Sequence, residues 1–145
     1  EQALAKERDF WHVKSYQYNR AILEVPEKQV IEEIKARWQL PAVYLTFLER
    51  FSPASDAFLK GINLYGANTL IKHQCGYAFS SPDDERFSDW KAHWLVIADK
   101  DADPYILDLS KSDGNDAPIY KAPHGAGEWK WRKVAGSFLE FLEKL

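Results

Sequence analysis

The chain of 145 residues is 46% hydrophobic and 28% charged, a composition typical of a globular protein with a packed core. Its formal net charge of −3 argues against a general nucleic-acid binder, because neutralising phosphates requires a basic surface. No apolar run approaches the length of a membrane span. We therefore expect one domain over residues 1–145, with neither a nucleic-acid nor a membrane partner.

The sequence contains one cysteine and no methionine, and each count supports a separate inference. Cys75 is the only cysteine, which excludes an internal disulfide and fits a reducing compartment, so we expect the protein in the cytoplasm. The sequence contains no methionine. Glu1 is therefore not an initiator residue, and we expect that a segment upstream of it has been removed.

The first half of the chain predicts helices. Residues 1–24 form an N-terminal extension with a weak pattern, in which a short helix from Ala3 to Trp11 is expected. From Val25 onward the pattern is clear, because Pro26 suits the first position of a helix and apolar residues follow at helical spacing. A second amphipathic helix begins at Pro41 and ends before Pro53. Two helices with so short a linker are expected to pack as a corner.

The stretch from Trp94 to Leu109 predicts a central hairpin. Leu95, Val96 and Ile97 form an uninterrupted apolar run, as in a strand buried on both faces, and the apolar signal returns after Pro104. The acidic residues between the two runs are typical of a turn. The other segments are assigned as follows: strand 58–65 with a bulge at Gly61, helix 69–77 with a strand as the alternative, acidic loop 80–89, loop 110–117, strand 119–122, strand 129–131 and helix 134–142.

This order of elements predicts an α+β fold, with helices packed on a mostly antiparallel, twisted sheet. The apolar positions of the helical stripes and of the strand interiors form the predicted core. Its members are Pro41, Tyr44, Phe47, Leu48, Ile97, Leu107, Phe138 and Phe141.

Four stretches in this order resemble the SUKH superfamily, the group of the Smi/Knr type: LPAVYLTFLERF, WLVIADKDADPYILDL, PIYKAPHGAGEW and SFLEFLEKL. The similarity covers Val25 to Leu145, and the order and spacing of the stretches carry it. One departure is Ala102, where the family often has Gly before the Asp-Pro pair. The resemblance implies a SUKH-like domain and, as its function, a bacterial immunity protein that binds a cognate toxin and blocks the toxin's active site.

Metal-site patterns are weak in this sequence. Asp99, Asp101 and Asp103 copy the alternating acidic residues that open a calcium loop, but Pro104 stands where that loop needs Gly and Ser110 where it needs Glu. The four histidines show no metal-ligand spacing; they are His12, His73, His93 and His124. We therefore expect no metal and no cofactor.

Catalytic patterns are equally weak. His73 and Cys75 are two residues apart, and such residues point to different faces of a helix, so we do not expect a thiol nucleophile with its base. The PHGAG stretch lacks the Lys and Ser/Thr of a phosphate-binding loop. We therefore expect no catalytic residue and a protein that is not an enzyme.

Three hypotheses about function follow, from different classes. The first is a non-catalytic binding protein that neutralises a toxin. The second, which the resemblance also covers, is a scaffold like the yeast cell-wall regulators of the group. The third is an enzyme with an unrecognised site, which would need convergent polar side chains with shifted pKa values.

Charge placement indicates where a partner would bind. Residues 82–116 carry ten acidic residues against four basic ones, and an acidic surface suits a toxin that is a basic nuclease. Solvation of loops is the alternative explanation, and the tryptophans Trp90, Trp94, Trp129 and Trp131 are either core or groove residues. The candidate partner-binding residues are Asp83, Asp84, Glu85, Asp89, Asp101, Asp113 and Asp116, with Trp90 as an aromatic anchor. His124 and Trp129, in the turn from His124 to Trp131, are the alternative contact if the acidic face is not used.

Overall fold

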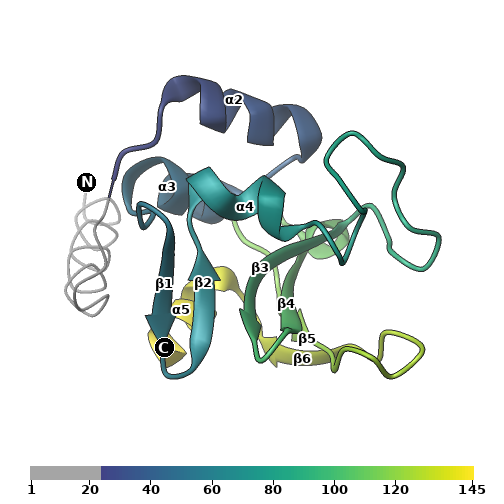
Figure 1. The fold of residues 1–145 in the computed structure, drawn as a ribbon. Coiled ribbons are helices and arrows are strands. Elements are labelled where there is room, and N and C mark those ends of the chain that lie inside the picture. Colours follow the sequence, from purple (N-terminus) through teal and green to yellow (C-terminus); the bar gives the residue numbers. More distant parts are fainter. Residues whose placement is uncertain (1–23) are drawn as a thin grey trace.

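A computed structural model describes residues 24–145 of the chain (Figure 1). The expected helix from Ala3 to Trp11 and the histidine His12 lie outside these residues. The helices are α2 (Lys28–Arg37), α3 (Ala42–Arg50), α4 (Ala67–His73) and α5 (Phe138–Lys144), with a 3₁₀ turn at Leu109–Lys111. The strands are β1 (Asp56–Leu59), β2 (Ile62–Tyr65), β3 (Trp94–Lys100), β4 (Asp103–Asp108), β5 (Ile119–Lys121) and β6 (Arg132–Ala135).

The six strands form one sheet in chain order, and each strand is antiparallel to the next. Helix α4 packs on β2 and β3, α2 packs on α4, and α5 packs on α3 and β6. Figure 1 shows α4 at the upper ends of β2 and β3, and α5 behind β1 and β2. The prediction of an α+β fold with helices on an antiparallel sheet is confirmed.

The central hairpin is confirmed in strands β3 and β4. Trp94 pairs with Asp108 at one end and Lys100 with Asp103 at the other, with an irregularity between Val96 and Ala98. The turn residues Asp101 and Ala102 have φ of 51° and 71°. This left-handed region favours glycine, so Ala102, the one departure from the family pattern, lies where a side chain strains the backbone.

Residues 58–65 were predicted as one strand, and this prediction is wrong. The structure places two antiparallel strands there, β1 and β2, each four residues long. Lys60 and Gly61 form the turn between them, with φ of 50° and 81°. Left-handed conformations at both central residues match the twist of a hairpin, so Gly61 serves a reversal of the chain and not a bulge.

The C-terminal elements also differ from the prediction. The expected strand 129–131 lies later, as β6, and the expected helix from Val134 begins only at Phe138. Ser137 sets this start, because its hydroxyl accepts a hydrogen bond from the N–H of Glu140 at 3.0 Å. Helix α2 likewise begins at Lys28, two residues after Pro26, which the sequence placed at the first helical position.

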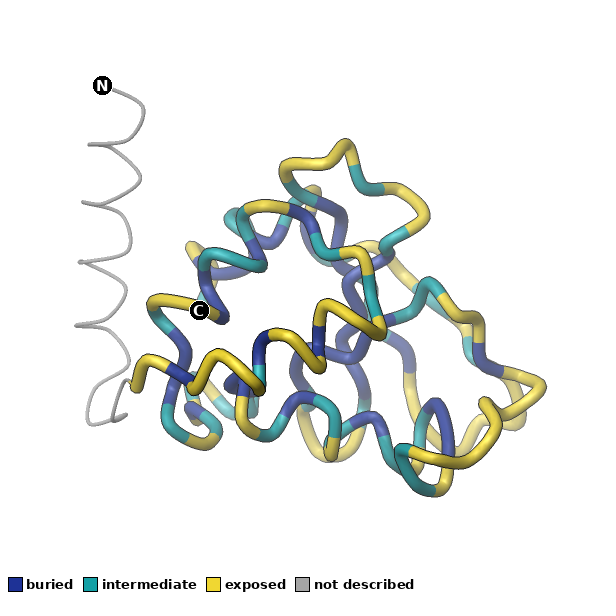
Figure 2. The backbone as a smooth tube through the Cα atoms, turned by 90° about the horizontal axis from the view of Figure 1, so that it is seen from above, coloured by how far each residue is buried: buried dark blue, intermediate teal, exposed yellow. Residues whose placement is uncertain are grey.

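All eight predicted core residues are buried. At the centre, the ring of Phe138 lies 4.8 Å from that of Tyr44, nearly perpendicular to it, and 5.1 Å from that of Phe47. These contacts join α3 to α5. In Figure 2 the buried segments gather in the interior of the molecule, and the exposed residues follow the helix surfaces and the outer loops.

Candidate partner-binding site

The acidic loop, residues 80–89, presents its four carboxylates to solvent. Asp83, Asp84, Glu85 and Asp89 are all exposed, and none of them forms an ion pair within residues 24–145. Backbone hydrogen bonds anchor the loop, among them that from Phe87 N–H to the carbonyl of Ala78 at 2.7 Å. The loop projects beyond the sheet at the upper right of Figure 1. Its unpaired charges are therefore held on a defined projection.

Trp90, directly after the loop, is only 2% exposed. Its indole N–H donates to the carbonyl of Trp94 at 3.0 Å. Its ring stands nearly perpendicular to those of Trp94, Trp129 and Trp131, with centroids 5.3, 5.4 and 5.8 Å away. Of the two possibilities left open for Trp90, core and groove, the structure favours the core, because neighbouring aromatic rings enclose it and leave little of it exposed as an anchor. Trp129 remains half-buried.

The turn around His124 lies beside the acidic loop. Asp89 and Trp129 line a small pocket of about 230 Å³ together with the glycines of this turn. Asp103 holds the turn, since its Oδ1 accepts the backbone N–H of His124 at 2.9 Å and lies 2.6 Å from the imidazole Nδ1. Hydrogen bonds from His124, first from its backbone and then from its side chain, hold the pKa of Asp103 below the usual value.

The remaining candidate acids lie elsewhere. Asp101 is exposed in the β3–β4 turn. Asp113 accepts the backbone N–H groups of Asp116 and Asn115 at 2.8 and 2.9 Å, which lowers its pKa. Asp116 accepts the N–H of Phe138 at 2.7 Å. Asp113 and Asp116 therefore order loop 112–117, which is hydrogen-bonded to α3 and α5, and no hydrogen bond or ion pair within residues 24–145 joins them to the acidic loop.

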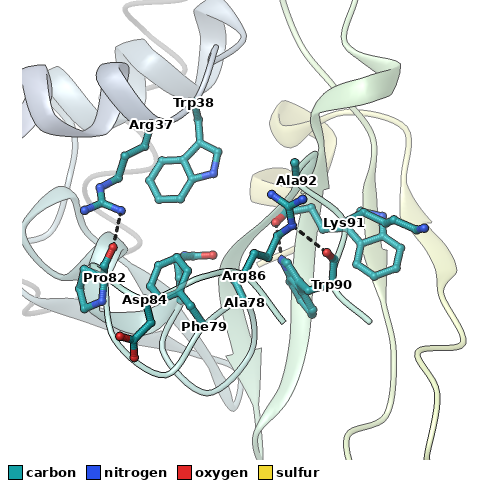
Figure 3. A pocket seen from close by; sticks show the side chains of 12 residues that line it. Arg37, Trp38, Ala78, Phe79, Pro82, Asp84, Arg86, Trp90, Lys91 and Ala92 are labelled. Atoms are coloured by element: carbon teal, nitrogen blue, oxygen red, sulfur yellow. Dashed lines mark hydrogen bonds between the residues drawn. The ribbon is translucent and has the colours of Figure 1, made fainter. Parts of the chain in front are cut away.

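The acidic loop also covers a groove that the sequence did not predict. A cavity of about 300 Å³ lies under the loop, and a second of about 480 Å³ adjoins it, because Arg37, Trp38 and Ala92 line both. We call the two together the Trp38 groove. Figure 3 shows Arg37 and Trp38, at the end of α2, facing the loop residues Pro82 and Asp84, with Arg86 and Trp90 on the other side of the first cavity.

Two arginines fasten the loop over this groove. Arg37 Nη1 donates to the carbonyl of Pro82 at 3.2 Å, and Arg86 Nε donates to the carbonyl of Trp90 at 3.0 Å (Figure 3). Neither arginine was a candidate from the sequence. They lie on segments separated by helix α3, the β1–β2 hairpin and helix α4, so only the fold brings them together and no local pattern could have indicated them.

A polar network beside α4 comes closest to an enzyme-like arrangement. The Oδ2 of Asp56 lies 2.6 Å from His73 Nε2, and its Oδ1 accepts the hydroxyl of Thr69 at 2.6 Å. The buried Tyr65 donates its hydroxyl to Asp99 at 2.5 Å, and its pKa is raised, first by burial and then by this bond. The oxygens of Asp56 are thus occupied by neighbouring side chains, and the network fastens α4 to β1.

Metal ligands do not converge in the described part of the chain. No group of three or more His, Cys, Asp or Glu side chains within residues 24–145 is placed to hold a metal ion. Next to the β3–β4 turn, Asp99 of β3 bonds to Tyr65 and Asp103 of β4 bonds to His124. None of the helices in the same residues is long and apolar enough to cross a bilayer.

An antiparallel six-stranded sheet with short helices and charged projecting loops defines a small α+β domain that offers loop surfaces for contact. The chain belongs to the SMI1 / KNR4 family (SUKH-1), whose family model matches residues 26–144. A search among curated proteins finds no match. Membership confirms the resemblance found in the sequence, and it is consistent with an immunity-type protein that acts through contacts with other proteins.

Proposed function

We propose that this protein is a non-catalytic immunity protein, which neutralises a cognate toxin with a basic surface, such as a nuclease, by binding it directly. The observation that carries the proposal is the set of four exposed carboxylates on the acidic loop, none with an ion-pair partner within residues 24–145. Membership in the SMI1 / KNR4 family supports it. The free thiol of Cys75 suits action in the reducing cytoplasm.

The physical role of the loop is to steer association. Clustered charges of one sign raise the rate of encounter with a partner of opposite charge and fix the orientation of the complex. Exposed charges are screened beyond about 8 Å at physiological ionic strength, so the association rate should fall as salt is added. The turn at His124 and Trp129 lies beside the loop and would form the second part of the contact.

The test pairs the protein with the product of the adjacent gene. Co-expression should protect cells from that product, and the purified proteins should bind. Replacing Asp83, Asp84 and Glu85 by Lys should slow association at least tenfold and leave the melting temperature near that of the parent. The matched control replaces Glu32, Glu33 and Glu49, which are exposed on α2 and α3, by Lys.

Equal slowing by both triple variants would contradict a specific role of the acidic loop. Slowing by neither would show that the loop lies outside the contact. If the adjacent gene's product neither harms cells nor binds, the scaffold function of the same family becomes the better hypothesis.

A further inference from the structure

We propose that the Trp38 groove binds an acidic segment of a partner protein, an extended stretch that carries Asp or Glu side chains. The inference goes beyond the proposed function, because it concerns the cavity beneath the acidic loop and not the loop's outer carboxylates. It adds a second interaction surface, of opposite charge to the first.

The charge of the groove carries the argument. Arg37, Arg86 and Lys91 line the first cavity, against the single carboxylate of Asp84. None of the three cations forms an ion pair with any carboxylate of residues 24–145. Three cationic side chains therefore lie beside one cavity without a carboxylate partner. The carboxylates of a binding partner would be complementary to them in charge.

The two arginines are oriented before any partner arrives. Each donates one hydrogen bond to a backbone carbonyl: Arg37 to that of Pro82, and Arg86 to that of Trp90. A guanidinium has five N–H donors in a rigid plane, so each arginine keeps others for a carboxylate. Because the bonds to the loop restrict these long side chains, binding a carboxylate orders less of them than it would on an open surface.

The shape of the groove favours a peptide segment. Trp38 is half-buried and lines both cavities of the groove, so its ring offers an apolar surface beside the cations. The second cavity adds polar side chains that can bond to a peptide backbone; these are Gln39, His93, Ser110 and Ser112. At about 300 and 480 Å³, the two cavities have the size of sites that hold several side chains.

A nucleic acid is the less favoured occupant. Asp83 and Glu85 are exposed on the loop that covers the groove, and the chain carries a net charge of −3. These charges repel a long polyphosphate, whose binding depends on neutralising many phosphates at once. A peptide brings only a few charges and can place them beside Arg37 and Arg86.

The experiment titrates the full chain with labelled, capped pentapeptides and follows fluorescence anisotropy. The acidic probe has a phenylalanine between two pairs of glutamates, and the matched probes have lysines or serines in place of the glutamates. We expect saturable binding of the acidic probe only, weakening as salt rises. Arg37→Glu and Arg86→Glu should each weaken it roughly five- to tenfold. Lys28→Glu, at the other end of α2, should leave it unchanged.

Several results would overturn the proposal: no saturable binding, equal binding of the serine probe, tighter binding of a short oligothymidylate, or equal loss in the Lys28 variant. Thermal melts establish that each variant is folded, which is expected because both arginines are exposed. The Lys variant of Asp83, Asp84 and Glu85 separates this inference from the proposed function. It should bind the acidic probe at least as tightly as the parent, while it slows association with a basic toxin.

Discussion

The carboxylate of Asp116 accepts a hydrogen bond from the backbone N–H of Phe138 at 2.7 Å, so a residue of a distant loop helps to cap the N-terminus of helix α5. The same carboxylate accepts the N–H of Leu139 at 3.3 Å. Ser137 accepts the next N–H, that of Glu140, at 3.0 Å. The first N–H groups of α5, which have no partner inside the helix, are thus all satisfied.

Replacing Asp116 by Ala should therefore lower the free energy of unfolding by about 1 to 2 kcal/mol, the usual loss when a capping side chain is removed. Urea unfolding followed by circular dichroism measures this difference. Asp101→Asn is the control, because Asp101 is exposed and Asn tolerates its left-handed φ. A loss no greater in the Asp116 variant than in the control would mean that these bonds do not stabilise α5.

The aromatic contacts between α3 and α5 give a second prediction. Phe47→Ala and Phe138→Ala should each cost about 3 to 5 kcal/mol, because both rings are fully buried and leave a cavity. Phe58→Ala is the matched control, since Phe58 on β1 is 75% exposed. Thermal melts compare the three variants. If Phe47→Ala or Phe138→Ala melted with the parent, the packing of these helices would be misassigned.

Sequence patterns predicted the parts of the fold that repeat over many residues. Helices α2 and α3 each show a stripe of apolar residues, and β3 is a continuous apolar run, so local periodicity sufficed. The β1–β2 hairpin was not predicted, because each of its strands is only four residues long and the turn at Lys60 and Gly61 interrupts one apolar stretch. A two-residue reversal leaves little trace in a periodicity measured over longer windows.

The site was less predictable than the fold. Exposed acids on loop 80–89 follow from composition, and they were predicted. Whether Trp90 is enclosed depends on Trp129 and Trp131, which arrive from the far end of the chain. The pairing of Arg37 with the loop at Pro82 likewise depends on tertiary contacts alone. Contacts between residues so far apart in the sequence depend on how the chain folds, and local sequence patterns do not contain that information.

A third prediction concerns Gly66, between β2 and α4. A Cβ at this position would overlap the carbonyl oxygens of Pro53 and Ser55, which are backbone atoms and yield little. Gly66→Ala should therefore cost about 1 to 3 kcal/mol or more, as overpacking does. Gly136→Ala is the control, because its Cβ would meet only the flexible carboxylate of Glu140 at 3.0 Å. Similar melting temperatures for the two variants would contradict the close approach at Gly66.

A fourth prediction is that added calcium or zinc will not stabilise the protein. The carboxylates that the sequence aligned with a calcium loop have other partners, since Asp99 accepts the Tyr65 hydroxyl and Asp103 binds His124. A specific ligand at about a hundred times its dissociation constant would add about 2.7 kcal/mol, which a thermal melt detects easily. The expected result is an unchanged melting temperature with either metal, and a clear rise would restore the metal hypothesis.

The last prediction follows from the hydrogen bonds between Asp103 and His124. These bonds hold the folded-state pKa of Asp103 below its ordinary value of about 3.9. A carboxylate with a lowered folded pKa adds stability that is fully present above the unfolded pKa and is lost as the pH falls through the folded pKa. The contribution of Asp103 should therefore persist at neutral pH and disappear on acidification below about pH 4.

Thermal melts from about pH 7 to about pH 2 measure this dependence. Asp103→Ala should melt below the parent at neutral pH, and the gap should narrow below about pH 4. His124→Ala should show a smaller gap, because the backbone N–H of residue 124, the larger cause of the lowered pKa, remains. Asp89→Ala, whose exposed carboxylate forms no ion pair within residues 24–145, is the control. A gap for Asp103→Ala that stayed constant down to the lowest pH would show that its carboxylate does not stabilise the turn through charge.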